Sequence, residues 1–163
     1  MSHLDVNEIN IEFWLGRLDG YLDALSIVNG YFREFRYFAY ICNISNKDIN
    51  TSITNLYKPD CTVTFGEVEK IRHWVRFLQE EFESLIVDES LSKAIENNKN
   101  RAFQIAWYII EMIRIISDNF SSEEIYKCTI QVNCDKDISE GILYAIPFKD
   151  KTLVINLQKI IKS

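Results

Sequence analysis

Apolar residues follow a helical spacing through the first part of the chain. Between Phe13 and Cys42 they recur at steps of three and four residues, which places them on one side of a helix. The residues of this stripe are Trp14, Leu18, Tyr21, Leu25, Val28, Phe32, Phe35 and Phe38. Asn29-Gly30 interrupts the stripe, and a glycine commonly ends or kinks a helix. The pattern therefore predicts two helices, or one broken helix.

Two more helical stripes follow. Thr64 and Glu67 have the spacing of a capping box, in which each side chain bonds the backbone amide of the other residue. The helix predicted behind this cap has the stripe Val68, Ile71, Val75, Leu78, Phe82 and Leu85. A further helix, capped by Asp88 or Ser90, is predicted to run to Ile116. Its buried stripe is Ala102, Ile105, Ile109, Met112, Ile113 and Ile116.

The spacing changes to an alternation after Glu124. Residues 127–134 place Cys128, Ile130, Val132 and Cys134 on one side, as in a half-buried strand. Residues 141–148 and 152–158 are two further strand-like runs, joined by a tight turn at Lys149–Lys151. We expect these three runs to form an antiparallel meander that packs on the helices.

Together these elements predict an α+β architecture in a single domain, residues 1–163. Residues 7–120 are expected to form an N-terminal helical bundle of four to five helices, and residues 125–160 a small three-stranded antiparallel sheet. A chain of this length buries roughly two thirds of its unfolded surface, so it needs no disulfide or metal to fold. A hydrophobic content of 47% also excludes a disordered chain.

The chain is acidic, with a net charge of −6. Residues 1–60 carry eight acids and five bases, and residues 61–120 carry ten acids and seven bases, whereas the remainder is neutral. A chain without a basic stripe is a poor candidate for binding nucleic acid. The same charge suits a basic protein partner.

Location and cysteine chemistry are predicted from the same composition. The first ten residues lack a basic start followed by an apolar run, and charges interrupt every long apolar segment, so we expect a cytoplasmic protein without membrane contact. Cys128 and Cys134 lie six residues apart in one predicted strand. That spacing separates their α-carbons by about 20 Å, too far for a disulfide. Free, buried thiols in a reducing compartment are the expected state of all four cysteines.

No catalytic or cofactor-binding motif is found. His3 and His73 are the two histidines, and neither has the ligand spacing of a zinc or di-iron site. Asp135–Gly141 begins like a calcium loop, but the required glycine and glutamate are missing from its sixth and twelfth positions. We therefore expect no cofactor and no enzyme activity.

One acidic run stands out in the helical part, namely Leu78–Ser90 with five acids and no base. Its acids are Glu80, Glu81, Glu83, Asp88 and Glu89. Two ordinary explanations remain open: Asp88 and Glu89 can belong to the first turn of the next helix, and Glu80 and Glu83 can pair with Arg76 or face solvent. The other explanation is an acidic patch that steers a basic partner, to which Asp19 and Asp23 would add.

The chain resembles the immunity proteins of bacterial contact-dependent and polymorphic toxin systems. The acid run "EEFESLIVDE", the aromatic run "YFREFRYFAY" and a globular domain without an active-site motif carry this resemblance. It implies a cytosolic inhibitor that occludes the active site of a cognate basic toxin domain, in this case a nuclease. Carboxylates would mimic the phosphates of the nucleic acid, and aromatic side chains would supply apolar contact.

Two other classes of function remain open from the sequence. One is a structural or scaffold homo-oligomer that associates through its aromatic residues. The other is a small-molecule-binding domain that uses a pocket between helices and sheet. The oligomeric state stays open as well.

Overall fold

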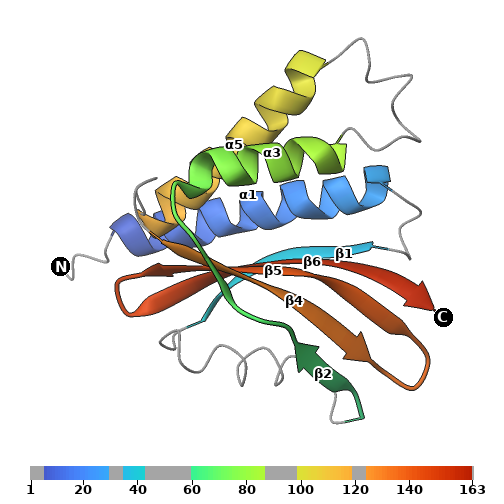
Figure 1. The fold of residues 1–163 in the computed structure, drawn as a ribbon. Helices are drawn as coiled ribbons and strands as arrows, with labels where there is room; N and C mark the ends of the chain where they lie inside the picture. Colours follow the sequence, from blue (N-terminus) through green and yellow to red (C-terminus); the bar gives the residue numbers. More distant parts are fainter. Residues whose placement is uncertain (1–5, 30–34, 43–59, 87–98, 119–123, 163) are drawn as a thin grey trace.

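The fold consists of a layer of helices packed on one face of an antiparallel sheet (Figure 1). The computed structural model describes residues 6–29, 35–42, 60–86, 99–118 and 124–162. Within these ranges, three helices cover one face of a six-stranded sheet. The predicted bundle of four to five helices followed by a three-stranded sheet is therefore wrong, although the mixture of helices and strands is present.

The described elements follow one another as a helix, three strands, two helices and three strands. They are α1 (Val6–Asn29), β1 (Phe35–Cys42), β2 (Thr62–Phe65), β3 (Glu69–Ile71), α3 (Trp74–Ile86), α5 (Lys99–Ser117), β4 (Ile125–Asn133), β5 (Ile138–Phe148) and β6 (Lys151–Lys162). The strand order in the sheet is β1-β6-β5-β4-β2, and β3 also pairs with β4. All pairings are antiparallel, with β6 and β5 inside the sheet and β1 at one edge.

Strand β1 occupies residues 35–42, for which the sequence predicted helix. Each of its eight residues pairs with a residue of β6. Tyr37 and Ala39 point toward the helices and are buried. Aromatic side chains suit a pleated strand, whereas the step of three from Phe35 to Phe38 also fits a helix. Pairing with β6, which is distant in the sequence, makes these residues a strand and not a helix.

Residues 62–71 form β2 and β3 rather than the beginning of a helix. Both strands pair with β4, and between them the Gly66 amide donates to the Thr129 carbonyl at 2.9 Å. Three residues separate Phe65 from Glu69, whereas two residues separate their partners Ile130 and Lys127 on β4. The extra residue makes a β-bulge. The predicted capping box at Thr64–Glu67 is therefore wrong, and α3 begins at Trp74.

The three C-terminal strands form the predicted meander, but they belong to a larger sheet. β5 and β6 are joined by a two-residue turn, in which Lys149 has a φ of 53°. Left-handed backbone at this position matches the twist of a short hairpin. The predicted turn at Lys149–Lys151 is confirmed.

Each helix buries one stripe in the core that the helices and the sheet share. α5 buries Ile109, Met112, Ile113 and Ile116, as the spacing predicted. α1 contributes Leu18, Leu22 and Leu25, and α3 contributes Trp74, Leu78 and Phe82. Each such side chain contributes roughly 1.5–3 kcal/mol on full burial, so the contact between the two layers is the main apolar core. None of the described helices is long and apolar enough to cross a membrane.

A disulfide joins Cys61, just before β2, to Cys134, just after β4. Their α-carbons are 4.3 Å apart, although 73 positions separate them along the chain. The expectation that all cysteines are free is therefore wrong. Cys128 keeps its thiol, as predicted, and burial raises the pKa of that thiol.

Candidate functional site

Three of the acids predicted to bind a partner lie on α3. Glu80 is exposed, and its Oε1 lies 3.5 Å from Nε of Arg76, one turn earlier. This is the ordinary pairing that the sequence left open. Glu83 is half-buried, and its Oε1 accepts a hydrogen bond of 3.4 Å from Nε2 of Gln79. Glu80 is thus paired with a base, whereas Glu83 is bonded to a neutral amide.

Glu81 belongs to a polar cluster that joins α3 to the sheet. Its Oε1 lies 3.5 Å from Nζ of Lys127, and its Oε2 accepts a hydrogen bond of 3.2 Å from the Tyr144 hydroxyl. Lys127 Nζ also lies 4.9 Å from the centroid of the Phe77 ring, within cation–π range. Burial of Tyr144, followed by the charge and hydrogen bond of Glu81 and the charge of Glu69, raises the pKa of Tyr144 well above its usual range. Glu81 is therefore a structural residue.

The remaining predicted acids are distributed over other parts of the chain. Asp19 Oδ1 accepts a hydrogen bond of 3.0 Å from the Ala39 amide, so Asp19 protects the outer side of edge strand β1. Asp23 is exposed on α1. Asp88 and Glu89 lie outside the described residues. The structure thus gives structural partners to several of these acids and does not gather them into one patch within its described ranges.

A different surface stands out on α5. Phe103, Trp107, Tyr108 and Ile115 are large apolar side chains with exposed fractions of 51%, 40%, 55% and 47%. They follow one another at steps of four, one and seven residues, which spreads them over an arc of about 140° on the exposed side of the helix; we call these four residues the α5 ridge. Grouped exposed apolar side chains mark interaction sites on soluble proteins, and Trp and Tyr contribute strongly at protein interfaces.

The α5 ridge was not predicted from the sequence, because none of its four residues belongs to the stripe that was predicted to be buried. The available signal was that Phe103, Tyr108 and Ile115 lie off the predicted buried stripe, on the side of the helix that also carries Glu111 and Arg114. In this fold one side of α5 is buried, and these three residues lie on the other side. Tyr37, from the aromatic run proposed for partner contact, is buried in the core instead.

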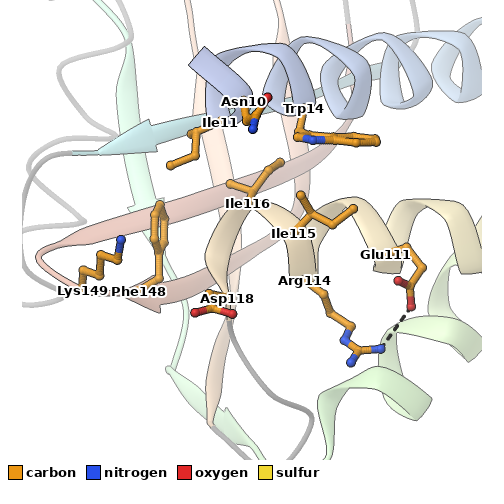
Figure 2. Close-up of a pocket in the computed structure, with 10 residues that line it drawn as sticks. All are labelled: Asn10, Ile11, Trp14, Glu111, Arg114, Ile115, Ile116, Asp118, Phe148 and Lys149. Carbon is orange, nitrogen blue, oxygen red and sulfur yellow. Dashed lines mark hydrogen bonds and ion pairs between the residues drawn. The ribbon is translucent and has the colours of Figure 1, made fainter. Parts of the chain in front are cut away.

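A pocket opens where the first half of α1, the end of α5 and the β5–β6 turn meet (Figure 2). Its volume is about 520 Å³, within the range of ligand-binding pockets. The apolar lining comprises Ile11, Trp14, Ile115, Ile116 and Phe148, and the polar lining comprises Asn10, Glu111, Arg114, Asp118 and Lys149. We call it the α5-end pocket. Ile115 belongs both to this pocket and to the α5 ridge, so the two surfaces are continuous.

Two acids and two bases border the α5-end pocket. Nη1 of Arg114 lies 3.1 Å from Oε1 of Glu111. Among the described residues, neither Asp118 nor Lys149 takes part in an ion pair. Asp118 has a φ of 48°, and its amide donates to the Arg114 carbonyl at 2.8 Å, which ends α5. The negative end of the α5 dipole therefore lies beside the pocket and favours a cation there.

The described residues contain no group of three or more His, Cys, Asp and Glu side chains that could hold a metal ion. His73, predicted within a helix, instead precedes α3 with a φ of 53° and is exposed. Its neighbour Trp74 is fully buried.

Comparison with protein-family models, with curated proteins and with solved structures found no match for this chain.

Proposed function

We propose that this protein is an inhibitor of the toxin-immunity type, which binds a cognate basic toxin domain and occludes its nuclease active site. The observation that carries the proposal is the α5 ridge, where Trp107 and Tyr108 are 40% and 55% exposed. Side chains of these types commonly provide the largest contributions at protein interfaces. A net charge of −6 supports a basic partner. The role proposed here is binding, without catalysis and without a cofactor.

The acids of α3 have a smaller part in this proposal than the sequence suggested. Glu80 pairs with Arg76, and Glu81 is engaged by Lys127 and Tyr144. Their negative charge is therefore partly neutralised within the chain. The α5 ridge would supply the main contact area, and the surplus of acids would act by steering the toxin toward it.

The proposed class requires a cytoplasmic location, and the Cys61–Cys134 disulfide speaks against it. Disulfides persist in oxidising compartments and are rare in the cytoplasm. Trapping free thiols in intact cells before lysis distinguishes a cytoplasmic location from an oxidising compartment. A trapped, reduced Cys61 supports the cytoplasm, whereas a fully oxidised pair places the protein in an oxidising compartment.

Binding to the toxin domain encoded by the adjacent reading frame tests the proposal. Calorimetry should show one-to-one association with the wild-type chain. Tyr108→Asp should weaken this association at least about tenfold, because it places a charge at a contact residue. Val68→Asp is the matched control, since Val68 is 58% exposed but lies between β2 and β3. Absence of binding, or equal binding by the two variants, would contradict the proposal.

The same ridge also suits a scaffold protein that associates with a second copy of itself. Sedimentation velocity distinguishes a self-associating scaffold from an inhibitor that binds a toxin domain. A tight dimer at low concentration that Tyr108→Asp converts to a monomer would favour the scaffold. The small-molecule alternative gains less support, because the α5-end pocket is open and neither Tyr nor His is among its described lining residues.

A further inference from the structure

We infer that the α5-end pocket accepts an arginine side chain of the partner and so anchors the partner on the α5 ridge. This inference rests on the proposed function and names the chemistry that the partner must present. The pocket lies between the helices and the β5–β6 turn, at the end of α5, and none of the predicted acids lines it.

The shape and lining of the pocket suit a long, flat cation. Ile115, Ile116 and Phe148 offer apolar surface to a methylene stem, and the Trp14 ring borders the opening (Figure 2). Trp14 already lies against a guanidinium of its own chain, since Cζ of Arg17 is 5.1 Å from its ring centroid. Guanidinium groups stack on aromatic rings while their stems cover apolar surface.

The charge at the pocket favours a cation next to Asp118. Within the described residues this carboxylate has no ion pair, and it lies at the C-terminal end of α5, where the helix dipole is negative. Glu111 is different, because Arg114 already holds it at 3.1 Å. Of the two bases in the lining, Arg114 is paired with Glu111, so Lys149 is the charge that opposes a cation in the pocket.

The ridge and the pocket share one side of α5. Tyr108, Glu111, Ile115 and Asp118 follow at steps of three and four residues, so they succeed one another along the helix. A partner segment that packs on Tyr108 and Ile115 would therefore extend to Asp118 without changing direction. The net charge of −6 favours a basic partner, and a basic partner has arginine available for this position.

Nuclear magnetic resonance of the full-length chain tests the inference with small probes. N-acetyl-L-arginine amide should shift the Trp14 indole and the amides of Ile115 and Asp118 in a saturable manner. N-acetyl-L-citrulline amide, which has the same shape without the charge, should bind about tenfold more weakly. Asp118→Asn should weaken arginine binding to the citrulline level, and asparagine tolerates the left-handed backbone at this position. Lys149→Gln should strengthen it.

Several outcomes would overturn the inference. These are the absence of saturable shifts, equal binding of the two probes, no effect of Asp118→Asn, and a preference for N-acetyl-L-glutamate amide. The proposed function is tested separately with the toxin domain. If the toxin binds and Asp118→Asn leaves its affinity unchanged, the arginine anchor is wrong and the inhibitor proposal stands. If the arginine probe binds and the toxin does not, the inhibitor proposal is wrong.

Discussion

The Tyr144 hydroxyl donates a hydrogen bond of 3.2 Å to Oε2 of Glu81, which ties helix α3 to strand β5. Tyr144 is fully buried, so its hydroxyl has little access to water as an alternative partner. The second oxygen of Glu81 holds Lys127 of β4 at 3.5 Å. An acid that the sequence assigned to partner binding thus connects the two layers of the fold.

Glu81→Ala should destabilise the protein, whereas Glu80→Ala should not. The first change leaves a buried hydroxyl without its acceptor and Lys127 without its counter-ion, at a cost of about 1–3 kcal/mol. Glu80 has only an exposed pair with Arg76, so its loss should change stability by less than about 0.5 kcal/mol. Urea unfolding of both variants measures the difference. Equal midpoints would show that the Glu81 cluster contributes nothing to stability.

Stability should fall at alkaline pH through Tyr144. Below about pH 10 this hydroxyl is protonated in both the folded and the unfolded chain, so it adds no pH dependence. Above that pH the unfolded tyrosine loses its proton while the folded one keeps it, because the pKa of Tyr144 is raised in the fold. Unfolding then releases a proton, and the free energy of unfolding decreases by up to about 1.4 kcal/mol per pH unit.

Tyr144→Phe provides the comparison for this pH dependence. Urea unfolding of the wild type and of Tyr144→Phe between pH 8 and pH 11 should give plots of unfolding free energy against pH whose slopes differ only above about pH 10. The wild type should have the steeper decline. Parallel curves over the whole range would mean that Tyr144 ionises normally in the folded protein.

Two glycines should respond to alanine in opposite directions. A Cβ at Gly141 would collide with the Leu157 carbonyl and approach Cα of Gln158 to 2.7 Å, so β5 and β6 would have to separate. We expect a loss of about 3 kcal/mol. Nothing lies within 4 Å of a Cβ at Gly20 on α1, where alanine should add about 1 kcal/mol through helix propensity. Thermal unfolding distinguishes the variants, and a stable Gly141→Ala protein would contradict the register of β5 and β6.

Reduction should destabilise the wild type through the Cys61–Cys134 disulfide. The bridge joins residues 73 positions apart and restricts the unfolded chain, so its loss should cost about 4 kcal/mol. Thermal unfolding with and without dithiothreitol measures this cost. In the double variant Cys61→Ala/Cys134→Ala the reductant should have no effect. A wild type that is insensitive to reductant would show that the bridge is not formed in solution.

The candidate site was only partly accessible from the sequence. The exposed pair of Glu80 with Arg76 follows from i,i+4 spacing, and the sequence left this pairing open. The hydrogen bonds of Glu81 to Tyr144 and of Asp19 to Ala39 connect distant parts of the chain. No local pattern marks such contacts, because they depend on how α3 and α1 lie on the sheet.

The sequence by itself determined the elements whose spacing is unambiguous. The stripe of α5 and the alternation of β4 are local properties, since a side chain repeats its direction every 3.6 residues in a helix and every two in a strand. Only the tertiary structure decided the state of residues 35–42, which fit either period, because pairing with β6 makes them a strand. It also decided which side of α5 stays exposed, because one sheet can cover only one side of each helix.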